Sequence, residues 1–125
     1  MSRLVFFNHA IMPSINQGIQ SGHAAVELLL KYNQTDYPEQ NKLVQEWAWQ
    51  HKTFVLLNGG MTSDLHHIKR LLKESTNLPW AEFREPDYGN MVTSLAVLVP
   101  DDYHVIPGCK GYTFFEILRN SKLAK

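Results

Sequence analysis

The run RLVFFN, residues 3–8, decides the fold that the sequence predicts. Its apolar residues follow one another without polar alternation and include β-branched and aromatic side chains, which is typical of a strand buried on both faces. Pro13 ends the run, and a helical pattern follows from Ser14 to about Tyr32. Ser14 with Gln17 three residues later is the pattern of a capping box. A buried strand followed directly by a helix predicts an α/β domain.

The first helix separates into two faces at a spacing of roughly 3.6 residues. One face is apolar, and we expect it to pack against the sheet. Gly18 and Gly22 lie on that face. Because glycines inside a helix cost stability, they indicate close approach to another element. The apolar face comprises Ile15, Gly18, Ile19, Gly22, Ala25, Val26 and Leu29, and the polar face comprises Asn16, Gln20, His23, Glu27 and Lys31.

The rest of the chain continues the alternation of strands and helices. Connections of the strand–helix–strand type predict parallel neighbours, whereas the short link between the last two strands allows an antiparallel pair. We therefore predict an α/β fold: a single domain over residues 1–125, built as a three-layer sandwich with a four-stranded mixed sheet and helices on both faces. The order is β-α-α-β-α-β-β-α, with helices over residues 38–50, 62–74 (capped by Thr62 or Ser63) and 112–122, and strands over 52–57, 80–85 and 93–99.

A predicted core follows from these elements. Each member lies within an apolar run or on the expected inner face of a helix. The core residues are Phe6, Val26, Leu29, Trp47, Val55, Leu57, Leu72, Leu95 and Val97.

Composition narrows the function classes. Twelve basic and twelve acidic residues cancel, so the chain lacks the overall basic excess typical of nucleic-acid binders. Cys109 is the single cysteine, which excludes an internal disulfide and favours a reducing compartment. No apolar run is long enough for a signal-peptide core or a membrane span, so we expect a cytoplasmic protein that does not bind membranes. No His/Cys/Asp spacing resembles a metal site, and the sequence implies no metal or cofactor.

Two places have the character of ligand sites, because open α/β sheets bind ligands beyond the carboxyl ends of their strands. The first joins Asn8 and His9 to the helix start at residues 14–17, and the second is the loop NGGMTS, residues 58–63. Backbone N–H groups there could bind a phosphate or carboxylate, although an ordinary strand-to-helix turn gives the same pattern. His23, in line with Asn16, could act as a general base or position a water near neutral pH. The alternative is a surface histidine paired with Glu27.

The segment QSGHAAV, residues 20–26, resembles the signature of the type 2 peptidyl-tRNA hydrolases, whose first helix reads roughly A-A-Q-x-x-H-A-A. The later strands and helices follow in that family's order and at similar spacing, so the resemblance covers about residues 3–100. It implies the same mixed four-stranded α/β sandwich. It also implies metal-independent hydrolysis of the ester that joins a peptide to the 3′ end of tRNA.

Carried over by position, Gln20 and His23 match the helix motif, and Thr93 matches the threonine that opens the family's last strand. The family's lysine, seven residues before the helix histidine, is Asn16 here. The family's Asp-Ala-Gly-x-Thr segment is shortened to residues 85–88, which leaves Glu85 or Asp87 for its aspartate. Losing the lysine removes a phosphate contact and an electrostatic partner, which can change a rate by about a hundredfold or more.

The predicted site joins the helix motif to the last strand. In this prediction His23 orients a water or a carboxylate, and Thr93 donates a hydrogen bond to the substrate carbonyl or phosphate. Three functions remain open: a divergent hydrolase acting at the tRNA 3′ end, a binding protein of the same fold for a small or nucleotide-bearing ligand, and a self-associating protein such as a homodimer. The candidate catalytic residues are His23, Glu85, Asp87 and Thr93, and the candidate ligand-binding residues are Asn16, Gln17, Gln20 and His9.

Overall fold

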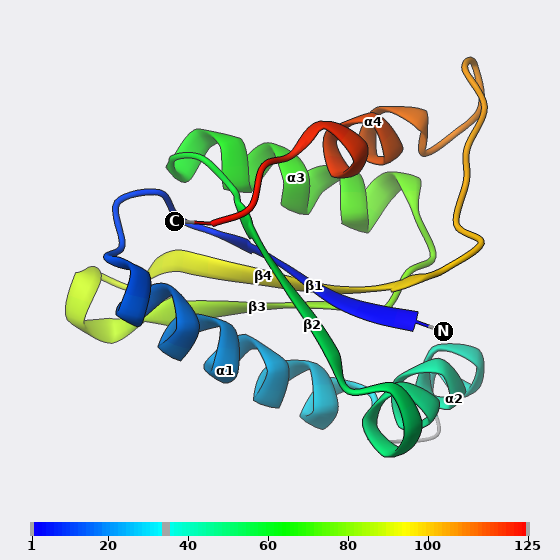
Figure 1. Ribbon diagram of the computed structural model, residues 1–125, viewed down its shortest axis with the longest axis horizontal. Helices are drawn as coiled ribbons and strands as arrows, with labels where there is room; N and C mark the ends of the chain where they lie inside the picture. The colour runs from blue at the N-terminus through cyan, green and yellow to red at the C-terminus, as the bar shows by residue number, and fades with distance from the viewer. Residues whose placement is uncertain (1, 34–35, 125) are drawn as a thin grey trace.

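A computed structural model describes residues 2–33 and 36–124 of the 125-residue chain. The elements follow the predicted order (Figure 1). A π-helical turn, η1 (Trp47–His51), follows α2, and a short 3-10 turn, η2 (Pro86–Tyr88), connects β3 to β4. The strands are β1 (Ser2–Asn8), β2 (Thr53–Asn58), β3 (Trp80–Glu85) and β4 (Met91–Pro100), and the helices are α1 (Ser14–Lys31), α2 (Pro38–Glu46), α3 (Thr62–Ser75) and α4 (Tyr112–Asn120).

The four strands form one mixed sheet in the order β2-β1-β4-β3. Val5 of β1 lies opposite Val55 of the parallel strand β2 and opposite Val97 of the antiparallel strand β4. β3 pairs with β4 in an antiparallel arrangement, as its short connection predicts. The prediction of an α/β fold with a four-stranded mixed sheet is therefore confirmed.

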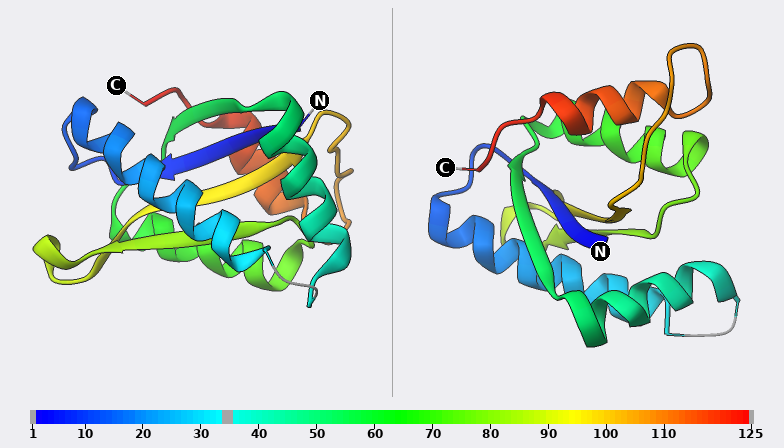
Figure 2. Two further views of the ribbon diagram at one scale, coloured as in Figure 1. Left: turned by 90° about the horizontal axis from the view of Figure 1, so that it is seen from below. Right: turned by 45° about the vertical axis from the view of Figure 1, so that its right-hand side comes forward.

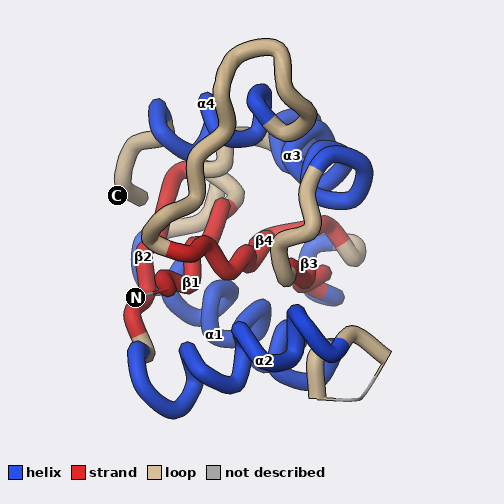
Figure 3. The backbone as a smooth tube through the Cα atoms, turned by 90° about the vertical axis from the view of Figure 1, so that its right-hand side faces the viewer, coloured by secondary structure: helices blue, strands red, loops and turns tan. Residues whose placement is uncertain are grey.

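Helices cover both faces of the sheet, and each face has its own core (Figures 1 and 3). Leu4 and Phe6 of β1 pack with α1, α2 and Trp47 on one face, whereas Val5 and Phe7 pack with α3 and α4 on the other. β1 is thus buried on both faces, which explains why its sequence is a continuous apolar run.

Several element ends differ from the sequence prediction. The predicted capping box of Ser14 and Gln17 is wrong: Pro13 is the N-cap residue of α1, and the Gln17 amide donates to the carbonyl of Met12 at 2.9 Å. The N-cap residue of α3 is Met61 rather than Thr62 or Ser63, and the Asp64 carboxylate accepts its backbone N–H at 2.9 Å. In both helices the sequence contains good capping side chains, but the chain enters the helix one residue away from the expected cap.

The predicted assignment of the faces of α1 is also wrong. The expected inner residues Ile15, Ile19 and Val26 are exposed, so Val26 is not part of the core. Gly18 and Gly22 have open space around them rather than a close neighbour. Ala25 and the half-buried Leu29 are the members of the expected face that contact the core. The buried residues of α1 are Gln17, Gln20, Ser21, Ala24, Ala25 and Leu28.

The other predicted core residues lie inside the molecule. Val97, whose exposure would have contradicted the strand assignments, is completely buried, and Val55 is half-buried against the α3–α4 core. The buried members of the predicted list are Phe6, Trp47, Leu57, Leu72, Leu95 and Val97.

Replacing Gly18 with alanine is expected to raise the free energy of unfolding by about 0.5–1 kcal/mol, because alanine favours the helix interior. A Cβ atom at this position meets nothing within 4 Å. Gly89→Ala is the matched control: its surroundings are equally open, but its φ of 64° is unfavourable for alanine, so this variant should be destabilised. Urea denaturation in dilute solution measures both. A loss of stability in Gly18→Ala would contradict the open surroundings of this face.

Candidate functional site

A layer of hydrogen-bonded polar side chains lies between α1 and the sheet. Asn8 at the end of β1 donates to the Ser21 hydroxyl of α1 at 2.9 Å, and Ser94 of β4 donates to the Asn8 side-chain oxygen at 2.7 Å. Thr93 donates to the Gln20 side-chain oxygen at 2.6 Å. All five side chains are buried. Because they bind one another, the polar residues of α1 can face the sheet without leaving unpaired groups.

A β-bulge brings Thr93 into this layer. Phe83 of β3 lies opposite Ser94, whereas the next residue, Arg84, lies opposite Val92, so Thr93 is the extra residue of β4. A bulge interrupts the strict alternation of side chains along a strand, so Thr93 binds Gln20 of α1 while its neighbour Ser94 binds Asn8 in the same polar layer. The sequence of β4 reads as an uninterrupted buried strand and gives no sign of this bulge.

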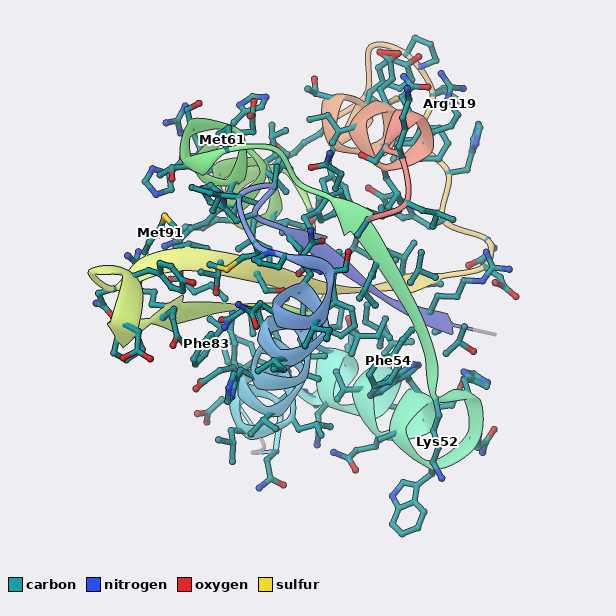
Figure 4. All side chains as sticks on the ribbon, turned by 60° about the vertical axis from the view of Figure 1, so that its left-hand side comes forward. Lys52, Phe54, Met61, Phe83, Met91 and Arg119 are labelled. Atoms are coloured by element: carbon teal, nitrogen blue, oxygen red, sulfur yellow. The ribbon has the colours of Figure 1, made fainter. Side chains whose placement is uncertain are left out.

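His23 lies one helical turn beyond Gln20 and is exposed. Its ring stacks on that of Phe83 in β3, with 4.5 Å between the ring centroids and 19° between the planes. Figure 4 shows Phe83 on the α1 side of the sheet. The structure therefore brings three residues of the family motif to one region: Gln20 contacts Thr93, and His23 follows on the same helix. Of these, His23 is the accessible side chain, and Thr93 is completely buried.

The other predicted catalytic residues lie elsewhere. Glu85 ends β3 and Asp87 lies in η2, both at the tip of the β3–β4 hairpin. Asn16 lies in the first turn of α1 and is half-buried. Seen from below, the beginning of α1 and this hairpin lie on different sides of the same end of the molecule (Figure 2). The convergence of Asn16 with one of the two carboxylates in a cleft stays a prediction.

His9 connects the end of β1 to the start of α3. Its Nδ1 atom accepts the backbone N–H of Ile11 at 3.2 Å, so its Nε2–H donates to the Thr62 hydroxyl at 2.9 Å. Burial lowers the pKa of His9, and the negative charge of Asp64 opposes this shift only in part. With both ring nitrogens engaged and only 1% of its surface exposed, His9 holds two loops together rather than facing a ligand.

The free energy of unfolding is expected to fall as the pH drops below about 6.5, the ordinary pKa of histidine. The lowered pKa of His9 means that the unfolded chain takes up its proton first, so the stabilising contribution is fully present above that pH and declines toward the pKa of the folded state. Urea denaturation between about pH 5 and 8, the range in which histidine titrates, measures the free energy of unfolding. In His9→Gln the decline should be shallower, and an identical slope in both proteins would refute this role.

The backbone N–H groups of Gly60 and Met61 in the glycine loop 58–63 donate hydrogen bonds to side chains of the loop and of α3. Gly60 donates to the Asn58 side chain at 2.9 Å, and Met61 donates to Asp64. Gly60 has a φ of 81°, and a Cβ atom on Gly59 would meet a carbon of the Phe7 backbone at 2.9 Å. The glycines therefore serve a tight strand-to-helix turn, and the carboxylate of Asp64 already occupies the position that an anion would take at this helix start.

A crevice lies beyond the carboxyl ends of β1 and β2, where α/β sheets commonly bind ligands. One hollow of 330 Å³ lies between the glycine loop and the end of α4, and a second of 270 Å³ includes Gln17 and Ala10. Asn58 and Lys122 line both hollows. The segment after α4 pairs with β2 here, through the bond from Asn58 N–H to the Lys122 carbonyl at 2.9 Å.

Sequence reasoning identified Gln20, His23 and Thr93 but missed several residues beside them. It missed the partners Ser21 and Ser94, the stacking ring of Phe83, and the contribution of Lys122 from the end of the chain. The adjacent polar pairs Gln20–Ser21 and Thr93–Ser94 are the one sequence signal for the polar layer.

In the described ranges 2–33 and 36–124, no three His, Cys, Asp or Glu side chains come close enough to bind a metal ion together. Within the same residues, no helix has the length and apolar character needed to cross a membrane.

No family model matches the sequence. No curated protein matches it at a significant level.

Proposed function

We propose that this protein is a divergent relative of the type 2 peptidyl-tRNA hydrolases, which hydrolyses the ester between a peptide and the 3′ end of tRNA without a metal ion. The contact between Gln20 and Thr93, one turn from the exposed His23, carries the proposal. These three residues were matched to the family motif by sequence position alone. Their convergence between α1 and β4 is what a common site requires.

The roles of the three residues follow from their burial. His23 is accessible and is the candidate general base that orients the attacking water. The Thr93 hydroxyl donates a hydrogen bond to the Gln20 side chain, so both are positioning residues that fix α1 on the sheet. This proposal therefore replaces the direct contact between Thr93 and the substrate that the sequence suggested.

The stacked rings of His23 and Phe83 also suit the end of an RNA strand. Unpaired bases bind proteins largely by stacking on aromatic and imidazole rings, which needs little positive charge. With twelve basic and twelve acidic residues, the protein is expected to bind tRNA weakly and with a shallow salt dependence.

The test is an assay of purified protein on a peptidyl-tRNA substrate, with and without a chelator. We expect measurable turnover that survives chelation. Asn16→Lys restores the charge of the family's lysine and should raise kcat/KM about tenfold or more, because it offers a phosphate contact near the helix start. Asn33→Lys adds the same charge to the exposed residue beyond the other end of α1 and should have little effect. No turnover in the parent and none in Asn16→Lys would refute the hydrolase proposal.

The crevice beside Lys122 favours a second candidate function, the binding of a small anionic ligand without hydrolysis. Its two hollows share an exposed lysine and lie at the usual ligand position of an α/β sheet. Calorimetric titration with AMP and with inorganic phosphate distinguishes the two functions. Binding that is lost in Lys122→Ala, in a protein without turnover, would support this second function.

A further inference from the structure

The outer face of α1 is apolar although it faces away from the sheet. Ile15, Ile19, Val26 and Leu30 are 79%, 51%, 54% and 60% exposed. Gly18 and Gly22 lie among them with nothing within 4 Å of a Cβ position. Figure 1 shows α1 below the sheet and beside α2, and the view from below in Figure 2 shows it uncovered in front of the sheet. We call these six residues the α1 outer face.

The pattern of this face is that of a helix that packs against another helix. Ile15, Ile19, Gly22 and Val26 of this face and the half-buried Leu29 at its border are separated by four, three, four and three residues, which is the heptad spacing of paired helices. No charged residue interrupts the stripe over the 18-residue helix, which is roughly 27 Å long. Exposed helix faces of globular proteins are ordinarily polar. The two glycines weaken the helix, and the described residues leave open space at their Cβ positions, so a second helix that approaches there would explain them.

We propose that a second copy of this chain docks on the α1 outer face, with the two α1 helices antiparallel about a twofold axis near Gly22. The face is complementary to itself in this arrangement. Gly22 meets Gly22 at the axis, Gly18 receives Val26 of the other copy, and Ile15 lies opposite Leu29. Large side chains thus meet small ones near the centre and pack on one another at the ends.

The flanking charges favour the antiparallel arrangement. Glu27 borders the stripe beside His23. In the antiparallel pair Glu27 lies level with Asn16 of the other copy, whose amide can donate to it. A parallel pair lacks this contact, because it holds Glu27 and Asn16 of the other copy about three helical turns apart.

The available area suits a dimer of moderate affinity. The four exposed aliphatic side chains offer on the order of 400 Å² of apolar surface per copy. A stable interface commonly buries about 800 Å² per partner, so the expected dissociation constant is about 1–100 µM.

The test is analytical ultracentrifugation of the full chain from about 1 to 500 µM, a range that brackets this affinity. We expect a monomer–dimer equilibrium. Ile19→Glu should raise the dissociation constant about a hundredfold or more, because it buries a charge in the interface. Ile106→Glu is the matched control, since Ile106 is an equally exposed isoleucine in the loop before α4, and it should leave the constant unchanged.

Two further outcomes separate an interface from a solvent-exposed helix face. Gly18→Ala should weaken the dimer at least about tenfold while the monomer folds normally, because the added methyl group fills the space for Val26 of the other copy. In a Cys109→Ser background, oxidation of mixed Ile15→Cys and Leu29→Cys proteins should yield the mixed disulfide in preference to the Ile15→Cys homodimer. A monomer at every concentration would overturn the proposal, and so would a dimer that Ile19→Glu leaves intact.

Discussion

Replacing Asn8 with alanine is expected to lower the free energy of unfolding by about 3 kcal/mol, because the variant leaves two buried hydroxyls with a lost partner. Asn8 is completely buried, donates to Ser21 and accepts from Ser94. It therefore joins three elements that are distant in sequence: β1, α1 and β4. Urea denaturation followed by circular dichroism measures the loss.

The neighbouring strand offers a matched control. Asn58 lies opposite Asn8 in the register of β1 and β2, but it is exposed, and its side chain accepts one hydrogen bond from Gly60. Asn58→Ala should therefore cost about 1 kcal/mol or less. Equal losses in the two variants would contradict a special contribution of the buried layer.

A triple variant distinguishes the contribution of the hydrogen bonds to stability from that of packing. Asn8→Leu combined with Ser21→Ala and Ser94→Ala replaces the three polar groups with apolar ones of similar volume. Removing every partner of a buried network is far less costly than removing one, so this protein should recover most of the stability that Asn8→Leu alone loses. A triple variant as unstable as the single one would indicate that shape, rather than polarity, matters at this position.

The sheet could be predicted because the residue pattern of its central strands indicates directly that both faces are buried. Each residue of β1 from Leu4 to Asn8 is buried, and an uninterrupted apolar run has no other favourable position in a small α/β domain. The antiparallel pairing of β3 and β4 followed from a connection too short for a crossover. Both arguments use local patterns whose physical meaning does not depend on the rest of the chain.

The faces of α1 could not be predicted in this way. The prediction assumed that the more apolar face packs on the sheet, whereas the sheet presents Asn8 and Thr93 to the helix. Ser21 and Gln20 bind them, and their polar character is satisfied inside the molecule. The position of Thr93 depends on a bulge that appears only when β3 and β4 pair, so the sequence of one strand cannot reveal it.

The candidate site could be predicted only in part, because the hydrogen-bond partners of its side chains depend on how the elements pack. Gln20 and Thr93 were chosen by their position in a motif, and they contact each other. His9 was grouped with the ligand-binding residues because it follows a strand, but both its ring nitrogens bind the protein itself. A titratable residue at the end of a strand indicates a possible ligand site. Its hydrogen-bond partners decide whether it is free to bind a ligand or to transfer a proton.

His23→Ala is expected to lower kcat on a peptidyl-tRNA substrate by about a hundredfold or more, which is the usual contribution of a general base. The stability of the protein should change little, because His23 is exposed and its ring packs on that of Phe83. The prediction depends on the proposed hydrolase function. His66→Ala is the matched control, since His66 is an exposed histidine on α3, on the opposite face of the sheet, and it should retain full activity.

His23→Phe distinguishes proton transfer from stacking. Phenylalanine can maintain the ring contact with Phe83 and can offer a surface to a base, but it cannot accept a proton. If His23 acts on the attacking water, His23→Phe should bind tRNA like the parent in a filter-binding assay and still lose about a hundredfold in kcat. If His23 only supports the RNA, His23→Phe should retain activity while His23→Ala raises KM. Activity equal to that of the parent in both variants would exclude His23 from the site altogether. The crevice beside Lys122 would then be the remaining candidate for the catalytic group.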